Sequence, residues 1–513
     1  MAQNKGSKTL SGRRGRLRAD SGATRLVVRD EATTRCMENV DMGCTDDVYI
    51  SCTENVNIQQ YKEAYLTKCF SLMANQWLVN YTFDDPVLQF LLTGLQQQQV
   101  ATAAAKSLEN ISSQCRGHMA NHLDGLLQIV QAVDTFNVSE EATTGLLKGA
   151  ASILTKVPHE KVTNALRQLC TYQVEALKKV LEQQDQKMAI GNKHHDPAVW
   201  LDRLAAIFRN LTPFPIESGQ DHPCQPVVLE IWPVLSDACT KYQADVRIIE
   251  RCCRCIRFVV RCLGRGSSAL LTPLVTQMVS LYNVHQHSCF LYLASILVDE
   301  YGKEANCIQG LVDMLQAFTV PTFKLLEQEN GLRNHPDTVD DLFRLCMRFT
   351  QRSPVVFLQC PVIKPLLCCG IAACGLDHKD ANASVTKFWT EFIKVGHERD
   401  TREDFELRKS LVKNLLEEHG KALVEAVIKA CVFCLPSYMM PDSADVIYEL
   451  MMFDRPQRPT PSLNQMLAHS VLGYSSSQLG PMSARHRIGE TLISVTDPEE
   501  MFTVPRSKRR LLV

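Results

Sequence analysis

The sequence lacks several features that define common classes of protein. Its longest nearly apolar run, residues 366–376, falls well short of the roughly 18 residues that a membrane-spanning helix needs. The first residues show no charged stub followed by an apolar stretch, the pattern of a secretory signal. Neither sign of charge prevails, since 55 Lys+Arg face 56 Asp+Glu and the net charge is -1. We therefore expect a soluble cytosolic or nuclear protein that contacts neither membrane nor nucleic acid directly.

Motifs of enzyme active sites are also missing. The chain has no Walker loop, no G-x-S-x-G, no H-E-x-x-H and no dinucleotide-binding glycine pattern. Isolated Ser, His and Asp residues occur, but no spacing assembles them into a catalytic group. The sequence therefore predicts a protein that is not an enzyme, with no catalytic residues and no cofactor.

Cysteine is abundant but follows no disulfide framework. The 21 Cys are an odd number scattered along the chain, which favours a reducing compartment and buried apolar thiols. Two pairs, Cys252 with Cys255 and Cys431 with Cys434, have the C-x-x-C spacing of a zinc or redox site. Both pairs fall inside predicted helices without the turn that a zinc knuckle needs. We interpret them as structural thiols.

A third candidate set is His285, His287 and Cys289. Its position between two helical segments favours a connecting loop over a metal site, so no metal is predicted. A thiol- or zinc-dependent enzyme stays open as an alternative that metal analysis and thiol titration can test.

From about residue 62 to 455 the chain shows the apolar periodicity of helices. Apolar side chains recur at spacings of three and four, and short polar breaks divide the segments. Several breaks pair a capping residue with a proline, as Asp-Pro at 85–86 and 196–197 and Ser-Pro at 353–354. A side-chain oxygen followed by proline is typical of a helix start. Alternating strands and hairpin turns are absent, so the core is predicted to be all-α.

These helices fit a repeat array better than a single core. About sixteen to eighteen segments pair into units close to the 40 to 47 residues of HEAT or armadillo repeats. We predict a HEAT-repeat α-solenoid over 62–455, with an irregular helical bundle as the alternative. The ends, 1–61 and 456–513, lack this periodicity and carry basic runs. We predict that both ends are disordered.

The most informative segment is 245–265, which contains six arginines and only two acids. The arginines are Arg247, Arg251, Arg254, Arg257, Arg261 and Arg265. Their spacings of three and four place all six within an arc of about 120° on one helix, opposite an apolar face.

Arginine rather than lysine on this face indicates recognition of phosphate or carboxylate through two hydrogen bonds. Like charges repel at these spacings, and a purely solvated face would mix in more acids. The segment extends about 27 Å as a helix, which suits an extended phosphorylated or acidic peptide. The alternative is a structural face whose arginines pair with acids on neighbouring helices.

Several long motifs distinguish the chain. They are VRIIERCCRCIRF (246–258), PLVTQM (273–278), HQHSCF (285–290), ILVDEYG (296–302), NHPDTVDDLFR (334–344), DFELRK (404–409) and CLP (434–436). These motifs resemble the importin-β superfamily of HEAT-repeat nuclear transport receptors, and within it the transportins that import serine/arginine-rich splicing factors. The resemblance covers about residues 85–456 and corresponds to the C-terminal half of those receptors.

The resemblance implies a receptor that binds phosphorylated arginine-serine segments of splicing factors and releases them when Ran-GTP binds. It further implies contacts with nucleoporins and shuttling between cytoplasm, nuclear pore and nucleus. Its cargo-binding residues correspond to the six arginines of 245–265. The N-terminal repeats that hold the chief Ran contacts have no counterpart in residues 1–84. We therefore expect cargo binding without Ran-driven release.

The origin of this difference stays open among an incomplete gene model, a splice form and a shortened paralogue. The alternative function is a general helical-repeat scaffold without transport activity, in which the arginines are structural.

Overall fold

The computed structural model describes residues 17–20, 23–26, 85–97, 100–136, 138–183, 195–212, 214–216, 220–398 and 403–453. The chain divides into two compact units, one of residues 1–110 and 136–142, the other of residues 111–135 and 143–513. Among the described helices, none is long and apolar enough to cross a membrane.

The first unit contains a strand pair, one complete helix and parts of two others. β1 (Leu17–Asp20) pairs antiparallel with β2 (Ala23–Leu26), with Leu17 opposite Leu26. α3 (Asp85–Leu95) follows, and its Asp-Pro start agrees with the predicted boundary. The strand pair was not predicted, because four residues are too few to establish an alternating pattern. Apart from these eight residues, the predicted ends lie outside the described part of the chain.

The described helices after α3 confirm the all-α prediction. Along the chain they are α4 (Ala101–Gln114), α5 (Arg116–Met119), α6 (Leu123–Gln131), α7 (Glu140–Leu154), α8 (His159–Glu182), α9 (Pro197–Asn210), α10 (Gln225–Lys241), α11 (Val246–Leu263), α12 (Ser268–His285), α13 (Cys289–Tyr301), α14 (Ile308–Leu326), α15 (Gly331–Asn334), α16 (Pro336–Arg352), α17 (Pro354–Leu358), α18 (Ile363–Ala373), α19 (Lys379–His397), α20 (Phe405–Lys429) and α21 (Met440–Phe453). Short 3₁₀ or π turns join some of them: η1 (Ala120–His122), η2 (Val133–Thr135), η4 (Gly264–Ser267), η5 (Ala430–Cys434) and η6 (Ser437–Met439).

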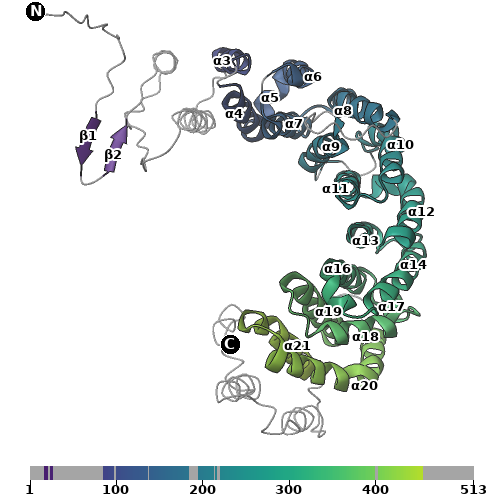
Figure 1. Cartoon of the computed structure of the whole chain (residues 1–513). Coiled ribbons are helices and arrows are strands. Elements are labelled where there is room, and N and C mark those ends of the chain that lie inside the picture. Colours follow the sequence, from purple (N-terminus) through teal and green to yellow (C-terminus); the bar gives the residue numbers. More distant parts are fainter. Residues whose placement is uncertain are drawn as a thin grey trace, which may run out of the picture. The chain divides into compact units, whose positions relative to one another are not determined.

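In the second unit the longer helices form two layers (Figure 1). One layer is the series α9, α11, α13, α16, α19 and α21, in which each helix packs on the next. The other layer contains α8, α10, α12 and α14, followed by α17, α18 and α20. Each helix pair of the second unit packs mainly on the neighbouring pairs, as a solenoid requires.

Hydrogen bonds between successive repeats reveal the repeat length. The Tyr282 hydroxyl contacts the Thr322 hydroxyl at 2.7 Å, 40 residues away. Gln277 Nε2 donates to the Ser236 carbonyl at 2.8 Å, 41 residues away. These separations agree with the predicted HEAT-like repeat and confirm the solenoid over the single bundle.

Aromatic side chains fill the core between α16, α17 and α19. The Phe343 and Phe388 ring centroids lie 5.3 Å apart, and Phe349 stacks on Phe357 at 5.7 Å. Gly370 of α18 faces this cluster, where an added Cβ would lie 3.1 Å from Phe343 Cε1. Large aromatic side chains therefore fill the space between these helices.

Candidate functional site

α11 begins and ends where the sequence supplies terminating chemistry. Asp245 caps the helix, since its carboxylate accepts from the Ile248 N–H at 3.2 Å. Gly264 ends it at φ 50°, a conformation that residues with a Cβ rarely adopt. Between these ends the cysteines and all apolar side chains except Val246 and Phe258 are buried, and the arginines face the other way.

Five of the six predicted arginines lie on α11, and we call them the arginine row: Arg247, Arg251, Arg254, Arg257 and Arg261. The prediction of six on one helix is wrong for Arg265, which lies in η4 (Gly264–Ser267). Because the positive φ of Gly264 ends α11, Arg265 is displaced from the row. Its side chain is the most exposed of those in ion pairs here, at 79%.

The first half of the arginine row pairs with acids of α9. Arg247 donates to both oxygens of Asp196, at 2.9 and 3.1 Å. Arg251 Nε and Arg254 Nη1 each lie 3.5 Å from a carboxylate oxygen of Asp202. Asp196 also caps α9 by accepting from the Ala198 N–H. Burial alone would raise the pKa of Asp196, but the hydrogen bonds from Arg247 and the backbone outweigh it and lower that pKa.

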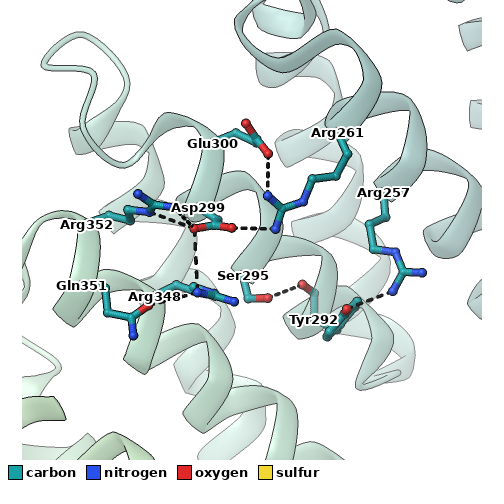
Figure 2. Close-up of polar contacts among 9 residues, drawn as sticks. All are labelled: Arg257, Arg261, Tyr292, Ser295, Asp299, Glu300, Arg348, Gln351 and Arg352. Atoms are coloured by element: carbon teal, nitrogen blue, oxygen red, sulfur yellow. Dashed lines mark hydrogen bonds and ion pairs between the residues drawn. The ribbon is translucent and has the colours of Figure 1, made fainter. Parts of the chain in front are cut away.

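The second half of the row faces α13 (Figure 2). Arg261 donates to Asp299 at 2.6 Å and to Glu300 at 2.7 Å. Arg257 donates instead to the Tyr292 hydroxyl at 2.9 Å, and its guanidinium lies over the Phe258 ring, 4.3 Å from the centroid. Beyond the end of α11, Arg265 Nη2 pairs with Glu304 Oε1 at 2.6 Å. Glu304 lies in the loop after α13.

The face is therefore less cationic than the sequence indicates. Five of the six guanidiniums, all except that of Arg257, meet five carboxylates, which are Asp196, Asp202, Asp299, Glu300 and Glu304. The acids come from α9, from α13 and from the loop after α13, far from the arginines in sequence. Counting charges within 245–265 alone could not detect them. The geometry agrees with the structural alternative, yet the ion-paired side chains of the row remain 31 to 46% exposed.

Sequence reasoning missed a second group of arginines, on α16. Arg352 Nε donates to Asp299 at 2.8 Å, and Arg348 Nη1 lies 3.9 Å from the same carboxylate (Figure 2). Arg344 Nε donates to Asp340 at 2.8 Å. The three arginines are spaced by four residues, so the same spacing test that found the first row could have found them.

Burial accounts for the first C-x-x-C pair. Cys252 and Cys255 are fully buried in α11, as predicted. Hydrogen bonding with a neighbouring thiol and burial raise the pKa of Cys252, and burial raises the pKa of Cys255, so neither favours the thiolate that binds metal. The second pair departs from the prediction, because η5 leaves Cys434 exposed and Cys431 half-buried.

The histidine set also lies where it was predicted. His285 ends α12 and Cys289 begins α13, with His287 between them. The His287 ring stacks on His285 with centroids 5.5 Å apart, and its Nε2 bonds the Gln243 carbonyl at 2.8 Å. The backbone partner gives His287 a structural role in this connection.

A different buried group, His222, Cys224 and Cys262, brings its potential ligand atoms within 4.8 Å of one another. Both His222 ring nitrogens already have backbone partners. Nε2 donates to the Cys262 carbonyl at 2.9 Å, and Nδ1 accepts from the Cys224 N–H at 3.1 Å. A hydrogen bond from the Cys262 thiol outweighs burial and lowers the pKa of Cys224 to about 6. The histidine contacts fix the start of α10 against the end of α11.

Family comparisons identify relatives of this chain. Residues 222–326 match a model described as the Transportin-3/Importin-13 fourth TPR domain, and residues 73–129 match the corresponding third TPR domain. The first match contains α10 to α14, and therefore the whole arginine row.

Two curated relatives extend the likeness along the chain. Transportin MOS14 of Arabidopsis thaliana is 23% identical over 416 residues, covering 78% of this chain and 41% of that protein. Importin-13 of Homo sapiens is 20% identical over 396 residues, covering 73% of this chain and 39% of that protein. This chain thus spans about two fifths of the length of the curated relatives it matches.

A solved structure of importin-13 in its cytosolic state superposes with a TM-score of 0.71 at 13% identity. It covers 94% of this chain and 52% of the importin-13 chain, and it shows that the two share a fold. Together, the domain models and the relatives show that this chain is similar to transportins and importin-13 over much of its length.

Proposed function

We propose that the chain is a nuclear import receptor, or part of one, similar to transportin-SR, the third transportin. Its cargo would be splicing factors, bound through their phosphorylated arginine-serine segments. The observation that carries this proposal is the position of the arginine row, which lies inside the segment matching the Transportin-3/Importin-13 domain model. The named relatives are transport proteins, which agrees with a binding function rather than an enzymatic one.

The chemistry of the row suits such a cargo through exchange of partners. A phosphoserine carries about −1.5 to −2 charges at neutral pH and has three acceptor oxygens, so it competes well with a single carboxylate for a guanidinium. Asp196 and Asp202 are about one-third exposed. Once displaced, they can accept arginines of the same cargo. A ligand in which arginine and phosphoserine alternate therefore satisfies both signs of charge.

The rest of the transport cycle belongs to the same proposal. It comprises release of cargo by Ran-GTP, contacts with nucleoporins, and shuttling between cytoplasm and nucleus through the pore. The family's chief Ran contacts lie in N-terminal repeats that the resemblance does not include. We propose that cargo binding is the activity this chain carries by itself.

The test is the affinity of the purified chain for an arginine-serine peptide in phosphorylated and unphosphorylated form. Changing Arg251, Arg254 and Arg261 together to Gln should weaken phosphopeptide binding at least 30-fold, because each charged hydrogen bond contributes about 1.5 to 3 kcal/mol. Arg167→Gln is the matched control, since Arg167 of α8 is 40% exposed and pairs with Glu230 of α10. Equal binding of both peptides, unchanged by the triple substitution, would exclude the cargo assignment.

The second candidate is a helical-repeat scaffold without transport activity. The five carboxylates that meet the arginines favour it, because ion pairing between repeats is a sufficient structural role for these side chains. In that case the triple substitution lowers the melting temperature and leaves phosphopeptide binding as it was. The same set of variants therefore separates the two functions.

A further inference from the structure

α16 carries a second row of arginines, which we call the α16 row: Arg344, Arg348 and Arg352. Their spacing of four residues puts them on one side of the helix, and their side chains are 34 to 41% exposed. The apolar residues of α16, such as Leu342 and Phe349, are fully buried. α16 therefore repeats the design of α11, with an apolar face inside and a guanidinium face outside.

Asp299 of α13 connects the two rows. Its side chain is only 6% exposed, and it accepts from Arg261 of α11 through one oxygen and from Arg352 of α16 through the other. Arg348 approaches the same carboxylate at 3.9 Å (Figure 2). Burial alone would raise the pKa of Asp299, but hydrogen bonds from Arg352 and Arg261 lower it. One buried negative charge thus serves guanidiniums from both helices.

The positive charges that neighbouring acids neutralise least on this surface are those of Arg257 and Arg348. Within the described residues, the contacts of Arg257 are a tyrosine hydroxyl and two aromatic rings rather than a carboxylate. In the described part of the chain, Arg348 has the 3.9 Å contact with Asp299 and a hydrogen bond from its Nη1 to Gln351 Oε1 at 3.0 Å. Both guanidiniums can therefore gain a strong acceptor without losing one.

We infer that the anion-binding surface does not end at α11 but continues across α13 to α16, where Arg348 and Arg344 receive later phosphates of the same cargo segment. This inference rests on the proposed function. Two helix spacings of 8 to 10 Å separate the rows, so crossing takes about 16 to 20 Å, or five to six extended residues. The partner is a phosphorylated peptide, because alternating arginines on the ligand can pair with partly exposed acids such as Glu300, whose side chain is 22% exposed.

The experiment compares two peptides of alternating arginine and phosphoserine, of eight and sixteen residues, on the full chain. The eight-residue peptide extends about 27 Å and can occupy one row, whereas the longer one can reach both. The double variant R344Q/R348Q should weaken the longer peptide about 10-fold and the shorter one less than 2-fold. The charge-matched control R167Q/R333Q, which alters exposed arginines of α8 and α15, should change neither.

Each other outcome has a defined meaning. If substitutions in the arginine row weaken binding but R344Q/R348Q changes neither peptide, the inference is wrong and the proposed function stands. If the arginine-row substitutions have no effect on peptide binding, the proposed function itself is wrong. The variant R344Q/R348K retains the charge at position 348. It should recover half or more of the affinity for the longer peptide that R344Q/R348Q loses, provided that thermal unfolding shows a folded protein. Tighter binding of a single-stranded RNA of equal charge would overturn the assignment to a peptide.

Discussion

Asp299 is the residue on which the arginine contacts converge, and it gives a direct test of partner exchange. Asp299→Asn removes the charge that competes with a phosphate for Arg261, Arg348 and Arg352. We expect the variant to lose about 1 to 3 kcal/mol of stability, because three guanidiniums lose a charged acceptor. We also expect it to bind the phosphopeptide more tightly, by about 3- to 10-fold, as measured by fluorescence anisotropy.

A cargo-binding role and a structural role of the arginines predict different results for this variant. If the arginines are only structural, Asp299→Asn lowers the melting temperature without any gain in phosphopeptide affinity. A loss of affinity would show that Asp299 positions the guanidiniums rather than competing for them.

Asp341 of α16 predicts a pH dependence of stability. Burial and the nearby Asp340 charge raise its pKa to about 7, although a hydrogen bond from Ser288 opposes them. An unfolded aspartate titrates near about 4, so between pH 4 and 7 the folded state holds a proton that the unfolded chain has lost. Stability contributed by this group therefore falls as pH rises through that window.

The variant Asp341→Asn should remove this dependence. Its melting temperature should exceed that of the wild type at pH 8, and the difference should vanish near pH 4, where the folded wild-type carboxyl is neutral. Asp124→Asn, at an exposed position of α6, is the control for a general change in charge. A difference in melting temperature between Asp341→Asn and the wild type that stays constant from pH 4 to pH 8 would contradict the raised pKa of Asp341.

At the scale of the element, the end of α11 decides which arginines share a face. Gly264 adopts φ 50° and ψ −128°, which a side chain makes unfavourable by about 1 to 3 kcal/mol. We expect Gly264→Ala to lower the free energy of unfolding by that amount, measured in denaturant. The control is Gly125→Ala in α6, where an added Cβ meets nothing within 4 Å and helix propensity should slightly increase stability.

Equal effects of the two alanine substitutions would contradict this account of Gly264. A larger effect at Gly264 would show that the turn fixes the boundary between α11 and η4. The position of Arg265 outside the arginine row is a consequence of that boundary.

At the scale of the molecule, packing between neighbours predicts that part of the second unit folds alone. A fragment of residues 158–453 begins just before α8 and keeps α9, α10 and α11 with the helices on which they pack. We expect it to show helical circular dichroism and a cooperative thermal transition. A fragment of residues 246–453 is the control, because it separates α11 from α10 and exposes its buried cysteines and isoleucines. Equal behaviour of the two would argue against repeat-wise packing.

The sequence alone determined the class of fold and the starts of α3, α9 and α17. Apolar periodicity and capping pairs such as Asp196 with Pro197 are local signals, because a helix forms from contacts within four residues. The same local rule identified the row on α11, since side-chain direction follows from helical spacing. It could not place Arg265 correctly, because the backbone conformation of Gly264 is not a matter of spacing.

Only the tertiary structure decided the electrostatic character of the site. The carboxylates of Asp196 and Asp299 lie 51 residues before Arg247 and 38 residues after Arg261, respectively. The packing of α9, α11, α13 and α16 in one layer brings these charges together. Ion pairs depend on distance in space, and a solenoid sets that distance by stacking repeats about 40 residues apart. The sequence therefore predicted which side chains face outward, and the stacking of repeats decided which acids meet them.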